Sequence, residues 1–284
     1  MKHKKFSLAS KVLVLTLIFG TTALAHLPYV LPLQFHTDQN VVTLYAGLSD
    51  KYFEPEMPGG GAEGGYDITV TNPSGKTKHA EYISRHKQLT LIEINTPSEG
   101  TYKVNRTLLS AALPHVVREG KAVRVLDVVS PERRKELEAQ RTEERRFLFR
   151  DEVKPDEIED VQIINHVITY VTRDKPNEAA LKPVGKGFEF DFKTHPNSVS
   201  VKSGIKLTAL IDGEAAPEII FDFYKQGVDK TIHSAKSDHN GIVNVRFNQS
   251  GIYVLRAQAP LESVKDGKIV NTRYINWLII EVKP

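Results

Sequence analysis

The residue with the most distinctive chemistry in this sequence is His26, because a predicted cleavage site ends immediately before it. Residues 1–25 combine a lysine-rich start, an apolar run over Val12–Phe19 and the small residues Ala23 and Ala25. This order is typical of a secretory signal peptide cut after Ala25, with a cut after Ala23 as the alternative. The apolar run is shorter than the roughly 20 residues of a membrane-spanning helix. No cysteine follows the cut, so the sequence predicts an exported chain without a membrane anchor.

Cleavage after Ala25 would place a free α-amine beside the imidazole of His26, and these two nitrogens can chelate one metal ion. Imidazole and amine nitrogens suit nickel, cobalt, copper or zinc better than magnesium or calcium. The remaining ligands must come from elsewhere in the chain. We assign His36, His79 and His86 as the candidate partners of His26 in this metal site.

Two of these candidates bracket a predicted strand, HAEYISRH, which runs from His79 to His86. Their spacing of seven puts them on opposite faces of a regular strand, so we expect only one of them at the site. His115, His166 or a carboxylate are further candidates. For each internal histidine, a surface or hydrogen-bonded role is the alternative.

Charge and composition exclude several classes of protein. The signal peptide carries four of the 38 basic residues and none of the 35 acidic ones. The mature chain of 259 residues is then close to neutral, which gives no reason to expect a nucleic acid partner. The sequence has no cysteine, which excludes disulfides, thiolate metal ligands and a cysteine nucleophile.

The motifs of common enzyme classes are missing from the sequence. It has no G-x-S-x-G, no H-E-x-x-H, no phosphate-binding loop and no dinucleotide-binding fingerprint. Asp238 and His239 would suit a serine triad, but SDHNG lies between two predicted strands and is typical of a hairpin turn. Glu189 and Asp191 alternate with phenylalanines, as on the exposed face of a half-buried strand. We therefore predict that the protein is not an enzyme.

An internal repeat organises the chain. Residues 89–104 and 242–255 share one pattern, in which an alternating strand meets a polar turn, then Gly-x-Tyr, then another strand. A strand-turn-strand pattern precedes each copy. Tyr102 and Tyr253 take the matching positions, and we expect both to close a sandwich corner. A repeated strand order predicts two domains of related architecture.

Short alternating strands separated by Gly, Asn, Pro and Ser predict an all-β protein of two immunoglobulin-like β-sandwich domains. We place the N-terminal domain at 26–176 and the C-terminal domain at 184–284, with the junction in the proline- and charge-rich segment 173–187. A charged helical insertion is expected at about 130–150, because Ser130 suits an N-cap and Pro131 the first helical position.

Several motifs occur in an order that identifies a family. These are H-x-x-aromatic-x-x-P at His26, Tyr29 and Pro32, then SDKYFEP, then KSGIKLTALIDGEAAPEIIFDFY and DHNGIVNVRFNQSGIYVLRA. The whole mature chain resembles a family of exported bacterial proteins labelled as a domain of unknown function. Its members are described as periplasmic components associated with cobalt or nickel uptake. The family usually has Trp where this chain has Tyr29, and the charged segment 130–149 is similar to an insertion.

The resemblance implies a periplasmic metal-binding or metal-delivery protein beside a transporter, with only His26 carried over as a site residue. Our first hypothesis is a non-catalytic accessory protein that binds nickel or cobalt for uptake. Its partners would be an outer-membrane receptor or an inner-membrane metal transporter. The alternatives are a metal-free protein that binds a protein or a saccharide, and a redox enzyme with copper held by an N-terminal histidine brace.

Overall fold

The computed structural model describes residues 27–49, 53–58, 67–110, 112–118, 121–127, 129–139, 147–228, 231–259, 262–263 and 271–284. The predicted signal peptide and His26 lie outside these residues. Strands make up 56% of the described residues, and the described part contains one α-helix, α1 (Pro131–Ala139). Within the described residues, no helix has the length and apolar character needed to cross a membrane.

The described strands form three sheets. The N-terminal sheet has the order β1-β3-β7-β6, with bounds Leu27–Pro32, Val41–Ser49, Thr90–Asn95 and Tyr82–Arg85. The C-terminal sheet contains β13 (Phe188–Phe192), β14 (Ile205–Ile211), β15 (Glu214–Ala215) and β18 (Ile242–Val245). Single turns of 3₁₀-helix lie at Arg150–Glu152, Pro155–Glu157, Ala179–Leu181 and Pro196–Ser198.

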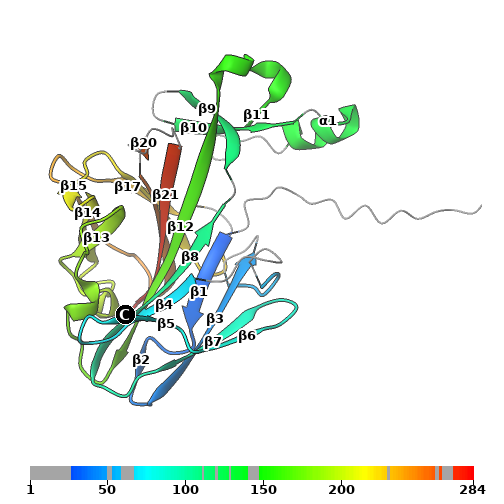
Figure 1. The fold of residues 1–284 in the computed structure, drawn as a ribbon. Coiled ribbons are helices and arrows are strands. Elements are labelled where there is room, and N and C mark those ends of the chain that lie inside the picture. Colours follow the sequence, from blue (N-terminus) through cyan, green and yellow to red (C-terminus); the bar gives the residue numbers. More distant parts are fainter. Residues whose placement is uncertain are drawn as a thin grey trace, which may run out of the picture.

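The central sheet is much larger, with thirteen strands (Figure 1). Its main order is β11-β10-β9-β12-β21-β19-β16-β17, with bounds Phe147–Phe149, Lys121–Leu126, Leu113–Arg118, Ile158–Arg173, Asn271–Val282, Gly251–Gln258, Ile220–Lys225 and His233–Lys236. Strands β2 (His36–Thr37), β4 (Asp67–Thr71), β5 (Thr77–His79), β8 (Gly100–Leu109) and β20 (Glu262–Ser263) pair beside this path.

Two hydrophobic cores lie on opposite faces of the central sheet. One core packs the N-terminal sheet against it, and the other packs the C-terminal sheet against its opposite face. Strand β12 shows the alternation directly, because Val167 and Val171 belong to the first core and Ile168 and Tyr170 to the second. Both faces of this strand are therefore covered.

The two copies of the internal repeat form matching units. In each, a hairpin (β4–β5 or β16–β17) lies in the central sheet, and the following strands cross from a small sheet into the central sheet. The crossing occurs at Gly-x-Tyr, where Gly100 and Gly251 have positive φ angles of 129° and 137°. The Tyr102 hydroxyl donates to the Ser98 carbonyl oxygen at 2.9 Å, and the Tyr253 hydroxyl donates to that of Gln249 at 2.8 Å. Both predicted corner tyrosines are confirmed.

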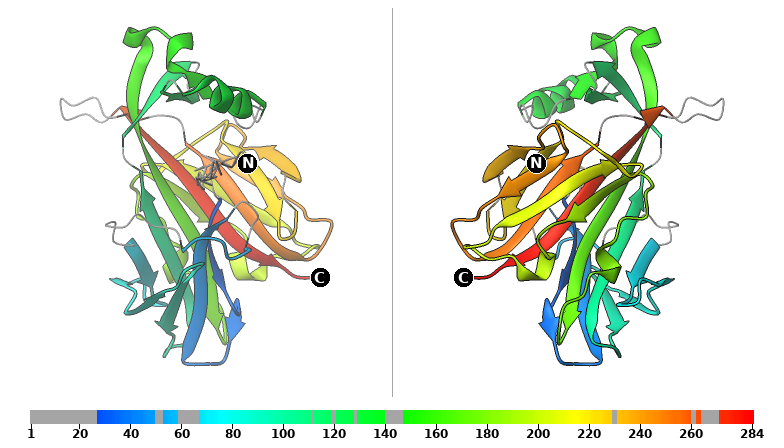
Figure 2. Two further views of the ribbon diagram at one scale, coloured as in Figure 1. Left: turned by 90° about the vertical axis from the view of Figure 1, so that its right-hand side faces the viewer. Right: turned by 90° about the vertical axis from the view of Figure 1, so that its left-hand side faces the viewer.

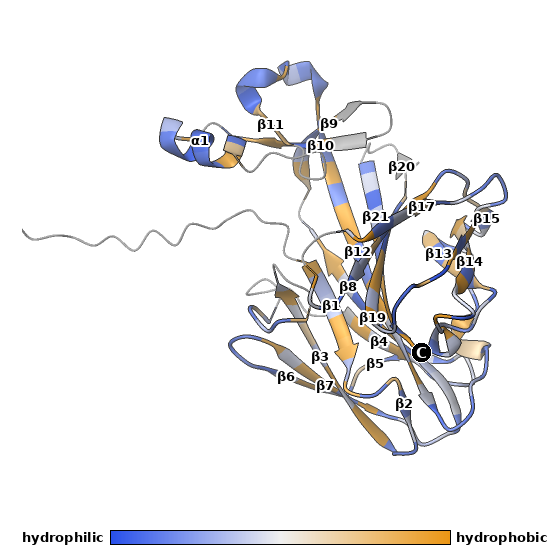
Figure 3. Ribbon diagram, turned by 180° about the vertical axis from the view of Figure 1, so that it is seen from behind, coloured by the Kyte–Doolittle hydropathy of each residue, from blue (hydrophilic) through white to orange (hydrophobic). Residues whose placement is uncertain are grey.

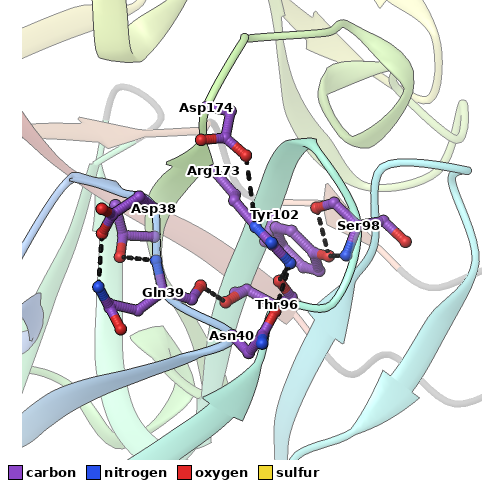
Figure 4. Close-up of polar contacts among 9 residues, drawn as sticks. Asp38, Gln39, Asn40, Thr96, Ser98, Tyr102, Arg173 and Asp174 are labelled. Atoms are coloured by element: carbon purple, nitrogen blue, oxygen red, sulfur yellow. Dashed lines mark hydrogen bonds and ion pairs between the residues drawn. The ribbon is translucent and has the colours of Figure 1, made fainter.

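Close to the first corner, Arg173 fixes the end of β12 against the N-terminal sheet (Figure 4). One guanidinium nitrogen donates to Asn40 Oδ1 at 2.6 Å and to the Thr96 carbonyl oxygen at 2.7 Å. The Arg173 Nε lies 3.4 Å from a carboxylate oxygen of Asp174. These bonds connect the last residue of β12 to the loop between β2 and β3 and to the loop between β7 and β8.

The two repeat units share one sheet, because their last strands, β12 and β21, pair in parallel over Val161–Thr169 and Asn271–Ile279. Figure 2 shows β21 in red beside β12 in green. The sandwiches therefore have a common central layer, whereas the sequence predicted two domains each with its own pair of sheets. The domain limits 26–176 and 184–284 remain predictions.

The helical segment predicted for about 130–150 is shorter than expected. Helix α1 begins as predicted, since the Arg133 N–H donates to Ser130 Oγ at 3.3 Å. The prediction was wrong at 147–149, where β11 pairs in parallel with β10. Phe147 and Phe149 are buried there and pack with Leu137 of α1, which an alternating strand allows. Figure 3 shows α1 mostly in hydrophilic colours, in contrast to β1.

Candidate functional site

The predicted metal site depends on His26, which lies outside the described residues. The described chain starts directly after it with β1, and Leu27 pairs with Ser49 at the end of the N-terminal sheet. The following residues Tyr29 and Val30 are fully buried. The backbone that continues from His26 is therefore held in a well-packed strand.

The three assigned partners of His26 lie in separate places. His36 lies four residues beyond Pro32, at the far end of β1, and Pro32 is itself about 17 Å along the strand from Leu27. His86 follows β6 at the same end of the N-terminal sheet as Leu27. Because β3 and β7 lie between β1 and β6, three strand spacings separate β6 from β1, which is about 14 Å. His79 ends β5 in the central sheet.

The strand predicted between His79 and His86 is present over Tyr82–Arg85 as β6, but the prediction that one strand runs from His79 to His86 was wrong. The chain changes sheet between them, because β5 pairs with β4 in the central sheet and β6 pairs with β7 in the N-terminal sheet. The Ala80 N–H donates to the Ile68 carbonyl oxygen at the change. Across the described residues, no group of three or more His, Cys, Asp or Glu side chains is placed to hold a metal ion.

A polar cluster around Asn197 joins the two halves of the chain. The His36 Nε2–H donates to the Asn197 carbonyl oxygen at 2.9 Å. His195 accepts the Asn197 N–H through Nδ1 at 3.1 Å, and its Nε2 lies 3.0 Å from Thr101 Oγ1. Burial lowers the pKa of His36 and of His195, and the charge of Lys283 acts in the same direction. Hydrogen bonds thus engage both imidazoles in a joint between the halves.

Beside this joint lies a partly open cavity of about 200 Å³ between β8, β12 and β13, which we call the junction cavity. Lys103 and Asn105 of β8 line one side together with His166, Ile168 and Tyr170 of β12. Alternate residues of a strand point the same way, so these side chains share the face of the central sheet that carries the second core. His166 was a further metal candidate, and it lies here instead beside an amine and a phenol.

The opposite side of the cavity is aromatic and aliphatic. Phe188, Phe190 and Phe192 of β13 contribute rings, and Leu181 and Pro183 add aliphatic surface from the segment before β13. The Tyr170 and Phe192 rings meet edge to face, with centroids 5.5 Å apart. Polar groups therefore gather on the β8 side of a cavity whose other wall is apolar.

Lys103 has an unusual environment for an ammonium group. Burial lowers its pKa, and the negative charge of Glu189 partly opposes that effect. Within the described residues, the Lys103 ammonium makes no hydrogen bond and no ion pair. Burial raises the pKa of Tyr170, and the charge of Glu189 adds to this, so the hydroxyl remains a hydrogen-bond donor at neutral pH.

The Glu189 carboxylate is held by the backbone at the mouth of the cavity. It accepts the N–H groups of Val184 at 2.9 Å, Gly185 at 2.7 Å and Lys186 at 3.2 Å. The sequence predicted this residue on an exposed strand face, but its side chain is only partly exposed. Three N–H donors satisfy this carboxylate, which fixes the loop over the cavity.

The cavity residues escaped prediction because Lys103 and Asn105 occupy the solvent-side positions of an alternating strand pattern. The available signal was the segment 161–172, which is apolar on both faces. A strand covered on both faces implies that its neighbour β8 is also covered on both faces.

Comparison with known proteins defines the family. Residues 23–260 match the family described as Domain of unknown function (DUF4198), and the chain belongs to this family. The family part of the resemblance is confirmed, while the match carries no link to cobalt, nickel or the periplasm. A search of curated proteins gave no match.

Several solved structures are similar over most of the chain. The D0-D1 domain of Intimin is 9% identical, over 90% of this chain and 97% of that one, with a TM-score of 0.21. The human OSCAR ligand-binding domain is 11% identical, over 90% and 99%, with a TM-score of 0.20. Native alpha-2-macroglobulin from Escherichia coli, in a structure spanning domains NIE-MG1, is 9% identical, over 87% and 96%, with a TM-score of 0.19. No function transfers at this level of similarity.

Proposed function

We propose that this protein is a non-catalytic accessory protein of the periplasm that binds nickel or cobalt for uptake. The observation that carries the proposal is the position of His26, directly after the predicted cleavage site and directly before β1. A free amine and an imidazole on one residue form a two-nitrogen ligand that suits these ions. An outer-membrane receptor or an inner-membrane metal transporter would be its partner.

The geometry adds two constraints to this proposal. The strand that follows His26 is buried from Tyr29 onward, so a metal bound at His26 would be attached to a rigid element. None of the other assigned histidines joins a ligand cluster in the described part of the chain. Of the three, only His86 lies at the same end of the N-terminal sheet as Leu27, which makes it the first partner to test.

The test starts with N-terminal sequencing of the exported protein, where a start at His26 is expected. Calorimetric titration with nickel, cobalt and copper then compares the processed protein with the His26→Ala and His86→Ala variants. We expect His26→Ala to weaken nickel binding by about tenfold or more. His239→Ala is the matched control, because His239 lies in an exposed turn in the other half of the chain, and should leave binding unchanged.

The outcomes separate the proposal from its alternatives. A mature start elsewhere, or a processed protein that binds no metal, would leave metal-free binding of a protein or saccharide as the function. Oxygen consumption that requires both copper and a reductant would identify a histidine-brace redox enzyme. Nickel or cobalt binding without such consumption supports the accessory function.

A further inference from the structure

We propose that the junction cavity binds one small organic carboxylate with a compact apolar body, held by the Lys103 ammonium and the Tyr170 hydroxyl. This site is independent of His26 and of any metal. It would give the protein a second ligand, at the joint between its two halves.

Unused hydrogen-bonding capacity inside the cavity is the first support. Lys103 carries three N–H donors, and none of them has a partner within the described residues. Asn105 Oδ1 is buried and has no donor. The Tyr170 residue is only 2% exposed, and its hydroxyl forms no hydrogen bond with a described residue. Buried polar groups normally have partners, and here one buried oxygen and two donors beside the same cavity have none within the described residues. A polar ligand in the cavity could supply these partners.

The charge around the cavity selects an anion. Lys103 lies inside, while Lys182 and Lys186 line the mouth, and Glu189 is the one carboxylate among the described lining residues. Backbone N–H groups already bind the Glu189 carboxylate. An incoming carboxylate would therefore pair with the Lys103 ammonium without displacing an existing ion pair.

The shape and the walls select the rest of the ligand. A cavity of about 150 Å³ is enough to hold benzene, whereas sites for drug-sized molecules begin at about 300 Å³. At about 200 Å³, the junction cavity suits a ligand of the size of benzoate. The rings of Phe188, Phe190 and Phe192 lie opposite the amine and would pack against an aromatic or short aliphatic body.

The experiment uses the processed full chain and sodium benzoate as the probe, with binding measured by calorimetry and by the shift in melting temperature. Benzamide tests the charge, because it has the same shape without it, and inorganic phosphate tests whether any anion suffices. We expect benzoate to bind with a stoichiometry of one, and benzamide and phosphate to bind at least about tenfold more weakly. Equal binding of benzamide, or no binding of benzoate at millimolar concentration, would overturn the proposal.

Variants then locate the site. Lys103→Met should abolish the benzoate-induced melting shift, and Tyr170→Phe should weaken binding about tenfold. Lys202→Met is the matched control, because Lys202 is exposed in a turn outside the cavity lining. The ligand-free Lys103→Met protein should melt at the same temperature as the wild type or higher, since a half-buried ammonium without a partner has been removed. A lower melting temperature with unchanged benzoate binding would show that Lys103 is only structural.

Discussion

Replacement of Asn197 by alanine should weaken the contact between the two halves of the molecule and lower the stability of the whole protein. Asn197 is 2% exposed, and its side-chain amide donates to the carbonyl oxygens of Phe35 and Tyr170 at 3.1 Å and to Thr172 Oγ1 at 2.9 Å. These acceptors belong to β12 and to the loop before β2, whereas Asn197 itself follows the predicted domain junction. The side chain therefore connects segments that are far apart in the sequence.

The size of the expected loss of stability follows from the hydrogen bonds that the exchange removes. The two N–H groups of the amide make hydrogen bonds of about 1–1.5 kcal/mol each, and buried oxygens left without this donor cost about 1 kcal/mol more. The exchange also removes Asn197 Oδ1, which is buried without a partner, and this offsets about 1 kcal/mol of the loss. We expect Asn197→Ala to lower the free energy of unfolding by about 2–3 kcal/mol. Asn95→Ala is the control, because Asn95 is exposed and makes one side-chain bond, to Glu81, and it should change this free energy by less than about 0.5 kcal/mol.

Urea unfolding at pH 7.5, followed by circular dichroism, measures both variants against the wild type. The midpoint of Asn197→Ala should fall while the slope with urea stays the same. A loss below about 1 kcal/mol would show that the cluster around Asn197 does not hold the halves together, and the reasoning would then fail.

Three further predictions concern stability. Because β12 and β21 contribute to both cores, the processed protein should unfold in one cooperative urea transition, and two separate transitions would favour independent domains. Burial lowers the pKa of His195 below the value of about 6.5 in the unfolded chain, so the folded state favours the neutral imidazole. The contribution of neutral His195 to the free energy of unfolding is therefore complete above about pH 6.5 and is lost as the pH falls below that value. Urea midpoints at pH 7.5 and 5.5 should differ less in His195→Gln than in the wild type, and an equal difference would refute this assignment. Gly204→Ala should destabilise the protein by about 2 kcal/mol more than Gly227→Ala in thermal melts. Both glycines have a positive φ, of 64° and 77°, but only at Gly204 would an added Cβ lie 2.2 Å from the Val245 carbonyl oxygen. Similar losses in the two variants would exclude this clash.

Much of the local structure could be predicted, because it depends on neighbouring residues. Gly-x-Tyr identified both corners, since a tyrosine hydroxyl reaches the backbone four residues earlier. The SDHNG segment forms a turn, in which Asp238 accepts the N–H groups of Asn240 and Ile242, each at 2.9 Å. The predicted hairpin was wrong, because β17 before the turn pairs with β16 in the central sheet and β18 after it pairs with β14 in the C-terminal sheet. The Ser130 cap also depends on neighbouring residues only, because Ser130 directly precedes α1 and accepts the Arg133 N–H of its first turn.

The long-range pairing could not be predicted in this way. The parallel pairing of β12 with β21 joins Val161 to Asn271, and no local pattern specifies a partner so distant in the sequence. The junction cavity depends on this pairing and on β13 covering β8, so Lys103 looked like an ordinary solvent-facing lysine. The metal site cannot be assembled from the spacing of histidines either, because His79 and His86 belong to different sheets.

The proposed metal function depends on a free amine at His26, and one comparison tests that directly. Nickel is titrated by calorimetry into the chain that starts at His26 and into the same chain with its α-amine acetylated. Acetylation keeps the imidazole and turns the α-amine into an amide without supplying a new amine, so we expect one strong site in the first protein and binding weakened by about tenfold or more in the second. Equal affinity in the two proteins would show that the free amine is not a ligand and would contradict the proposed function.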